Sequence, residues 1–244
     1  MRRLPVLLVS ALGWAGFNLV TVWTMAFLAD VVVPRTVDGP QRLGTPAAVV
    51  TDVGLLLLFG VQHTVMARHG FKARLRPWMP APFERAVYVL ATDVVLLLLL
   101  LCWQPFGGEV WRVDGAFAVV LWVLYAVGWA WSIGATFAVD HLELVGLRQA
   151  GWLAGTTTAR AGGLQTGGLH ALMRHPLMTG LLVTVWATPH MGGSHLLYAV
   201  GVSGYIAFGL RFEERDLRRA FGPAYDEYAG RVGAVLPRLT TRGG

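Results

Sequence analysis

Six apolar segments run through the chain and decide what it can fold into. They cover residues 4–28, 47–67, 83–103, 117–139, 177–189 and 195–212, and most approach the roughly 20 residues that a helix needs to cross a bilayer. The fifth is short, so we expect it to be tilted, kinked or partly re-entrant. With 55% hydrophobic and 14% charged residues, the chain has too little polar surface to cover a soluble globule. The pattern predicts an all-α, polytopic membrane protein with about six transmembrane helices.

The first segment follows Arg2 and Arg3, as the apolar region of a secretory signal peptide would. Its apolar stretch is longer than the roughly 7 to 15 residues of such signals, and no clear small-residue cleavage site follows it. We therefore predict that it is a membrane span. The sequence contains no repeat of fixed period and no hydrophilic stretch long enough for a soluble domain, which predicts a single membrane domain over residues 1–244.

The basic residues segregate along the chain. If the N-terminus is cytoplasmic, only Arg35, Arg42 and Arg112 of the 20 lysines and arginines lie outside, as the positive-inside rule requires. This distribution predicts that both termini are cytoplasmic. The arginines gather at membrane borders, where they meet membrane lipids. They are not interleaved with stacking aromatics on an exposed domain, so no nucleic acid is expected as a partner.

Signals for a metal site are weak. Cys102 is the single cysteine, which excludes an internal disulfide and a Cys-rich metal site. His190 and His195 flank two glycines in an expected outer turn, but a histidine pair without carboxylate or cysteine partners is more typical of a solvated loop. We therefore expect no bound metal.

Polar residues concentrate in two segments assigned to the cytoplasmic side, 140–176 and 211–232. In the first, a glycine-rich stretch precedes LHALMRHP at 169–176. A residue before proline avoids the helical region, and proline suits the first turn of the following helix. Arg174 and His175 are thus expected at a break between two helices. Such a break exposes backbone N–H groups and a positive dipole end, which suit an anionic ligand beside a guanidinium.

The second polar segment, RFEERDLRRAFGPAYDEYAGRV, continues out of the last apolar segment. Its Gly-Pro pair predicts two short C-terminal helices, and Tyr225 and Tyr228 fall at helical spacing on the second. This helix is expected to be amphipathic and to lie on the membrane surface or on the loop at 140–176. Glu213 and Glu214 lie where the membrane ends, and taken alone they are typical of an interfacial charge cluster.

Taken together, TGGLHALMRHPLMTG and EERDLRRAFGPAYDEYAGRV resemble the C-terminal half of the integral membrane methyltransferase family that includes isoprenylcysteine carboxyl methyltransferases and phospholipid N-methyltransferases. The resemblance implies S-adenosylmethionine as cofactor, bound in a cytoplasmic loop region within 140–232. Its carboxylate, ammonium and diol groups call for a guanidinium, carboxylates and backbone donors. The contacts that the resemblance implies are Gly168, His170, Arg174, His175, Pro176, Leu177, Glu213 and Glu214.

The N-terminal half extends the resemblance. QHTVMARHGFKARL, PAPFERAVYVL, CWQPFGGEVW and DHLELVGLRQ are similar to the bacterial methanethiol S-methyltransferase branch of that family. The resemblance then covers nearly the whole chain after the first apolar segment. It implies methyl transfer to a small thiol, namely methanethiol, with dimethyl sulfide as the product. Relatives often carry a tyrosine where this chain has Met178, so any contact from that tyrosine is not expected here.

The reaction is an attack of a sulfur nucleophile on the cofactor methyl, so the enzyme must align the two and supply a thiolate. Thiols are mostly protonated at neutral pH, since even the cysteine thiol has a pKa near 8.5. In DHLELVGLRQ we expect His141 as the base, with Glu143 as its orienting partner or as an alternative base. A hydrogen-bonded interfacial histidine would fit His141 equally well.

Other polar residues of the chain are candidates for the thiol site or for helix contacts. Gln62 and His63 lie at the cytoplasmic end of the second apolar segment, where they could line a substrate pocket or bridge helices. Arg148 and Gln149 are expected as support for the base. Asp93 lies in the middle of an apolar segment, where a carboxyl should be protonated, paired or facing a polar cavity.

Three functions remain open at this point. The first is S-adenosylmethionine-dependent methylation of a small thiol. The second keeps the chemistry and replaces the acceptor by a lipid-borne one, a prenylated cysteine carboxylate or a lipid amine. The third is a non-enzymatic membrane protein that shares the fold.

Overall fold

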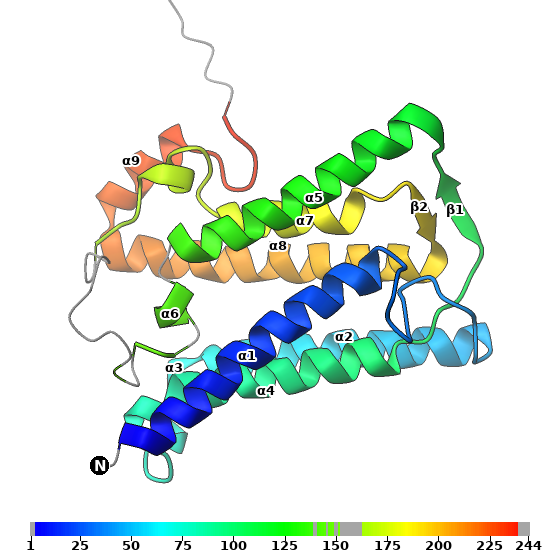
Figure 1. Ribbon diagram of the computed structural model, residues 1–244. Helices are drawn as coiled ribbons and strands as arrows, with labels where there is room; N and C mark the ends of the chain where they lie inside the picture. The colour runs from blue at the N-terminus through cyan, green and yellow to red at the C-terminus, as the bar shows by residue number, and fades with distance from the viewer. Residues whose placement is uncertain (1–2, 139–140, 145, 149–150, 152–162, 239–244) are drawn as a thin grey trace, which may run out of the picture. The chain divides into compact units, whose positions relative to one another are not determined.

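The computed structural model describes residues 3–138, 141–144, 146–148, 151 and 163–238. Helices make up most of them (Figure 1). The chain forms two compact units, each of which is built from three stretches of sequence. The first unit contains Met1–Val113, Asp140–Thr157 and Pro189–Gly201, and the second contains Asp114–Val139, Thr158–Thr188 and Val202–Gly244.

Within the described residues, five helices are long and apolar enough to cross a membrane. They are α1 (Arg3–Leu28), α2 (Thr45–Ala67), α4 (Ala81–Cys102), α5 (Gly115–Ala138) and α8 (Gly193–Phe221). The chain is thus mostly helical and has the composition of an integral membrane protein.

The apolar segment expected at 177–189 differs from this pattern. It forms α7 (Pro176–Trp186), a helix of only 11 residues, which reaches about 16 Å, roughly half of the hydrocarbon core. The helix ends before Pro189, whose ring excludes the preceding residue from the helical region. α7 is therefore not a sixth full span, and the expected total of about six transmembrane helices stays a prediction.

In the first unit, α1 and α2 pack against α4 (Figure 1), and the short α3 (His69–Leu75) follows α2. Asp93 of α4 lies against α1 at Gly16, where an added Cβ would be 2.6 Å from the carboxyl Oδ2. The carboxyl is buried, and this oxygen has no hydrogen-bond partner among the described residues. Asp93 is thus placed at a close contact between α4 and Gly16 of α1, and within the described residues its Oδ2 makes no hydrogen bond across the two helices.

The first unit also contains a two-stranded antiparallel sheet. It pairs β1 (Glu109–Arg112) with β2 (His190–Gly192). Beside it, the Trp103 ring stands edge-on to the rings of Phe27 and Tyr198, and its Nε1 donates to the carbonyl of Val37 at 3.1 Å. The sequence analysis expected only a turn near His190, because strands of three and four residues leave no alternating pattern to detect.

In the second unit, α5 packs along α7 through small residues (Figure 1). A Cβ on Gly180 would lie 2.7 Å from the carbonyl oxygen of Gly128, and one on Gly128 would lie 2.9 Å from the Thr184 methyl. The indole Nε1 of Trp131 donates to the carbonyl of Pro176 at 3.0 Å. Membrane helices commonly approach each other in this way, because small residues let two backbones come into contact.

Gly180→Ala is expected to lower the free energy of unfolding by about 1–3 kcal/mol, because the new methyl meets the backbone of Gly128 and Ser132 in addition to the Ser132 hydroxyl, and the backbone cannot easily move aside. The matched control is Gly204→Ala on α8, where no atom of the described residues beyond the helix's own backbone lies within 4 Å of the added Cβ. Unfolding in detergent by heat or denaturant measures both variants. Equal behaviour of the two would show that the α5–α7 contact is not as close as described.

The rest of the second unit surrounds the C-terminal part of α8. This helix ends at Phe221, Gly222 adopts a φ of 54°, and α9 (Pro223–Arg231) follows. Tyr225, Tyr228 and Ala229 of α9 form a small core. The two remaining helical elements are α6 (His141–Leu144), in the first unit, and the 3-10 helix η1 (Gly168–Ala171), in the second.

Candidate functional site

Arg174 lies at the centre of a charged group in the second unit. Its Nε donates to Glu214 Oε1 of α8 at 2.9 Å, and its Nη2 donates to the same oxygen. Its Nη1 donates to the carbonyls of Ala229, at 3.2 Å, and of Val232. The side chain is 9% exposed. Two nitrogens of the planar guanidinium thus hold one carboxylate oxygen while the third holds two carbonyls, which the single nitrogen of a lysine ammonium cannot reproduce.

The backbone around Arg174 is joined to the C-terminal segment. The N–H groups of Arg174 and His175 donate to the carbonyls of Gly233 and Ala234 at 2.9 and 3.0 Å, and Met173 forms a parallel bridge with Gly233. The chain that leaves α9 therefore lies beside the break between η1 and α7. The sequence analysis placed the break correctly but had no signal for this pairing.

His175 is buried between the two neighbouring glutamates. Its Nδ1 lies 3.5 Å from Glu213 Oε2, and its Nε2 lies 3.3 Å from Glu214 Oε1. Glu214 is 15% exposed and also binds Arg218 at 3.2 Å. Glu213 is 53% exposed, so it is the more open carboxylate of the pair. The structure thus brings together four residues that the sequence had placed 39 positions apart in two segments.

Helix α7 starts within this charged group. His175 is its N-cap, Pro176 occupies the first turn, and no side chain caps the N-terminus. Leu177 is half-buried in the same turn. The first N–H groups of a helix have no intrahelical acceptor, and they carry the positive end of its dipole. This end of α7 therefore adds backbone donors beside the two glutamates.

His170 and two tyrosines lie on the other side of Arg174. The Tyr228 hydroxyl donates to the His170 carbonyl at 2.5 Å. Burial lowers the pKa of His170, and the neighbouring His175 lowers it further. Burial also raises the pKa of Tyr225 and of Tyr228. All three side chains are therefore neutral at neutral pH.

Gly168 opens η1 with a φ of 59°, in the left-handed region. Apart from its chain neighbours, no atom of the described residues lies within 4 Å of the position that a Cβ would take. The glycine is explained by this backbone conformation, which side chains rarely adopt. The open space beside it is compatible with the expected close approach of a ligand.

The polar residues predicted for the thiol site fall in the first unit. The ring of His63 contacts Tyr88 and Thr92 of α4, and Gln62 Nε2 lies 3.4 Å from Thr92 Oγ1. The sequence analysis missed Tyr88 and Thr92. The signal that could have found them is the spacing of Arg85, Tyr88 and Thr92, which places three polar residues on one face of an otherwise apolar helix.

The stretch after α5 holds the expected base. His141 begins α6, but its side chain lies outside the described residues, as does the whole of Gln149. Glu143 is exposed, and its charge interacts with that of Arg85. Arg148 is half-buried, and its N–H donates to Leu142 at 3.3 Å. The chain then passes close to α4, because a Cβ on Gly146 would lie 3.3 Å from the Arg85 side chain.

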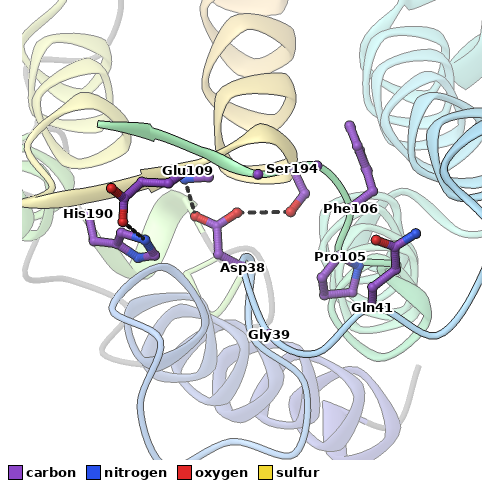
Figure 2. Close-up of a pocket in the computed structure, with 11 residues that line it drawn as sticks. Asp38, Gly39, Gln41, Pro105, Phe106, Glu109, His190 and Ser194 are labelled. Carbon is purple, nitrogen blue, oxygen red and sulfur yellow. Dashed lines mark hydrogen bonds and ion pairs between the residues drawn. The ribbon is translucent and has the colours of Figure 1, made fainter. Parts of the chain in front are cut away.

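A polar pocket of about 160 Å³ lies beside the β1–β2 sheet of the first unit (Figure 2). Its main polar residue, Asp38, accepts hydrogen bonds from Gly192 N–H at 2.6 Å, Ser194 Oγ at 2.9 Å and His195 N–H at 3.0 Å. These groups form the start of α8, where a carboxylate is favourable. Through these hydrogen bonds, Asp38 holds the loop after α1 against the start of α8.

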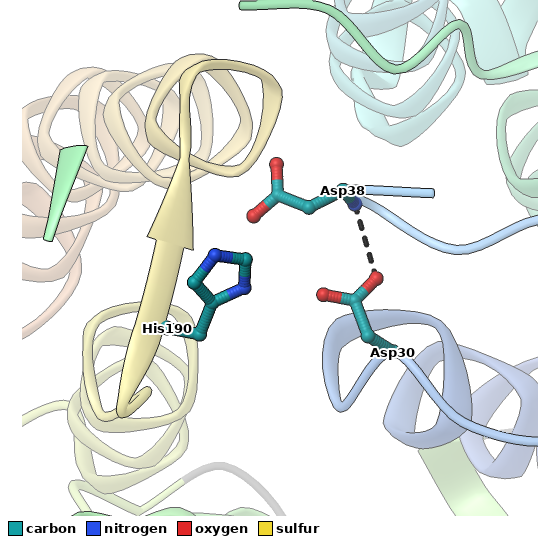
Figure 3. A group of neighbouring side chains, drawn as sticks. All are labelled: Asp30, Asp38 and His190. Carbon is teal, nitrogen blue, oxygen red and sulfur yellow. Dashed lines mark hydrogen bonds between the residues drawn. The ribbon is translucent and has the colours of Figure 1, made fainter. Parts of the chain in front are cut away.

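Asp30, Asp38 and His190 approach one another near this pocket (Figure 3). One ligand atom from each lies within 4.8 Å of the others, a spacing that could hold a metal ion. The hydrogen bonds of Asp38 to the start of α8 account for its position without one. The expected absence of a metal remains a prediction, which metal analysis of the purified protein would test.

The chain is similar over nearly its full length to bacterial methyltransferases. It is 41% identical to methanethiol S-methyltransferase of Mycobacterium tuberculosis, over 97% of this chain and 98% of the relative. It is 40% identical to methanethiol S-methyltransferase of Pseudomonas deceptionensis, with 97% and 91% covered. It is also 30% identical to nurim of Sus scrofa, over 68% of this chain and 67% of nurim.

No protein-family model matches the chain, and no solved structure matches it. The region matched by the bacterial enzymes covers 97% of this chain and therefore spans both units. By this full-length identity, the chain belongs to the methanethiol S-methyltransferase family.

Proposed function

We propose that the protein transfers a methyl group from S-adenosylmethionine to methanethiol and thereby forms dimethyl sulfide. The observation that carries the proposal is the 38–41% identity, over nearly the full chain, to three enzymes named for this acceptor. The charged group of the second unit supports the choice of donor, because its chemistry matches the polar groups of that molecule.

The donor site is assigned to Gly168, His170, Arg174, His175, Pro176, Leu177, Glu213 and Glu214. The exposed carboxylate of Glu213 suits an ammonium or a ribose diol, and the uncapped start of α7 suits a carboxylate. Arg174 is already held by Glu214 and by two carbonyls, so its role is to fix Glu214 and the C-terminal segment in place. S-adenosylmethionine supplies an electrophilic methyl on a sulfonium.

The acceptor site is assigned to the first unit, with Gln62, His63, Arg148 and Gln149 as binding residues. The thiol must lose its proton to become a good nucleophile. His141, oriented by Glu143, is one candidate for the base, and Glu143 alone is an alternative. His63 is a further candidate, for which the described residues allow a detailed argument.

We also propose that both units act as one membrane domain over residues 1–244, with the cofactor region at 140–232. The protein would lie in a bacterial inner membrane, with both termini and the donor site on the cytoplasmic side. The basic residues support this orientation, because the few that would lie outside are Arg35, Arg42 and Arg112. The C-terminal helix α9 is then a surface helix at the inner leaflet.

The test is headspace gas chromatography on purified, detergent-solubilised protein with methyl-labelled S-adenosylmethionine and methanethiol. Labelled dimethyl sulfide above the level without enzyme is the expected result. Binding of the donor is measured in parallel by titration calorimetry. Donor binding without labelled product would refute methanethiol as acceptor and direct the search to larger thiols and lipids. An absence of donor binding would refute the assignment of S-adenosylmethionine.

A further inference from the structure

A cluster of polar side chains lies between two apolar helices of the first unit. We call it the α2–α4 polar group; it consists of Gln62 and His63 on α2 and of Arg85, Tyr88 and Thr92 on α4. The Tyr88 hydroxyl oxygen lies 2.9 Å from Nε2 and 3.1 Å from Nδ1 of His63. Ionisable groups within membrane helices are costly, and each is therefore a candidate for a functional site.

The hydrogen bonds of Thr92 indicate which nitrogen of His63 carries the proton. The Thr92 hydroxyl donates its one hydrogen to the Tyr88 carbonyl at 3.0 Å, so its oxygen only accepts. This oxygen lies 3.4 Å from His63 Nδ1, which favours a proton on Nδ1. Nε2 is then left with a lone pair and accepts from the Tyr88 hydroxyl. His63 is thus a base oriented by one hydroxyl and directly contacted by another, the arrangement that activates nucleophiles in enzymes.

Neighbouring groups hold this arrangement in place. The ring of His63 stacks on Phe59, with centroids 5.3 Å apart, so it has little freedom to turn. Gln62 Oε1 is buried and has no hydrogen-bond partner among the described residues. It is an acceptor that a ligand S–H could use.

The charge of Arg85 acts on His63, and further charged groups of the same unit lie on α3, α4 and α6. The Arg85 guanidinium lies 5.4 Å from the centroid of the Tyr88 ring. Glu143 of α6 interacts with Arg85, while Lys72 of α3 and Glu84 of α4 pair with each other at 3.1 Å. Arg85 is therefore the cation that the described contacts place against Tyr88. A nearby cation favours the anionic form of a thiol.

We propose that Tyr88 and His63 form a proton relay that activates the thiol. The S–H bond breaks, its electron pair stays on sulfur, and the proton passes to the Tyr88 hydroxyl oxygen while the phenol's own proton passes to His63 Nε2. The products of the step are a thiolate, an intact phenol and a protonated imidazole. This inference rests on the proposed methyl transfer; it adds Tyr88 as a catalytic residue and makes His63, rather than His141, the proton acceptor.

The experiment follows dimethyl sulfide formation by His63→Gln, Tyr88→Phe and the double variant from neutral to alkaline pH. His63→Gln is expected to lower kcat about 100-fold at neutral pH, the low end for loss of a general base. Activity should recover as the pH rises, because free thiol then ionises without a base. Tyr88→Phe should show a smaller loss with the same recovery. The double variant should lose no more than His63→Gln alone, because the two residues act in one step.

The controls separate the relay from a structural role. Tyr198→Phe removes one hydroxyl from another buried tyrosine of the first unit, and His190→Gln removes an imidazole from β2; both should keep the wild-type pH profile. Donor affinity, measured by titration calorimetry, should stay unchanged in His63→Gln and Tyr88→Phe. If His63→Gln does not fold, the relay is tested by Tyr88→Phe alone. Its activity should then recover as the pH rises, and a loss that is equal at every pH would refute the relay.

Three results would overturn the relay while the proposed function stands. They are a loss of activity that is equal at every pH, additive losses in the double variant, and alkaline recovery in His141→Ala but not in His63→Gln. Absence of labelled dimethyl sulfide with the wild-type protein would instead overturn the proposed function, and the relay with it.

Discussion

Glu214→Gln is expected to reduce kcat/KM by roughly 100-fold or more. Removing one partner of a largely buried, hydrogen-bonded charge pair costs about 2–5 kcal/mol, which corresponds to a loss of this size. Glutamine keeps the size of the side chain but not its charge. Arg174 and His175 both contact Oε1, and Arg218 contacts Oε2. All three then face a neutral amide, and the geometry beside the start of α7 is lost.

Titration calorimetry with S-adenosylmethionine and the dimethyl sulfide assay measure this effect. The matched control is Glu227→Gln on α9, because that glutamate is 73% exposed and pairs only loosely with Arg231 at 3.5 Å. Exposed pairs of this kind contribute little, so the control should resemble the wild type. If Glu214→Gln bound the donor with wild-type affinity, the assignment of Glu214 to the donor site would be wrong.

Arg174→Lys is the second change with a large expected effect. Lysine keeps the positive charge but has one nitrogen, whereas Arg174 uses three to reach Glu214, Ala229 and Val232. The uncompensated carboxylate and carbonyls should lower the free energy of unfolding by about 3 kcal/mol, as for a broken buried ion pair. The C-terminal segment should become open to proteases, and donor binding should be lost.

Limited proteolysis and thermal unfolding in detergent follow this variant. Arg219→Lys on α8 is the control, because Arg219 is 79% exposed and its ion pair within the described part of the chain is with the exposed Asp216, at 3.5 Å. It should leave cleavage and donor binding unchanged. If Arg174→Lys resisted proteolysis like the wild type, the guanidinium would not be what holds the C-terminal segment beside the break.

The long helices could be predicted well because the bilayer requires one simple property of them, a run of apolar residues of sufficient length. Four apolar segments correspond closely to α1, α2, α4 and α5. The prediction was less successful for α7, which ends at Trp186 and is too short to span. The predicted apolar segment extends beyond Trp186, but there the chain leaves the helix and enters strand β2. The partner strand β1 lies nearly 80 residues earlier in the sequence.

Around the site, the sequence placed a helix break at Arg174 and His175 and paired carboxylates at Glu213 and Glu214, and the structure brings these residues together. The partners that complete the group were not predictable. The carbonyl of Val232 has no side-chain signature, so nothing in the sequence shows that it would accept a hydrogen bond from Arg174. The role of these residues in binding the donor stays a proposal.

The amino-acid sequence by itself determined the helical membrane architecture, the position of the break before Pro176 and the family resemblance, because these depend on local composition and on short motifs. Only the tertiary structure decided that Tyr88 meets His63 across α2 and α4, that Asp38 binds the start of α8, and that the C-terminal segment lies beside Arg174. Each of these contacts joins residues at least 25 positions apart. Their pairing depends on how helices pack, and periodicity along one chain does not encode that.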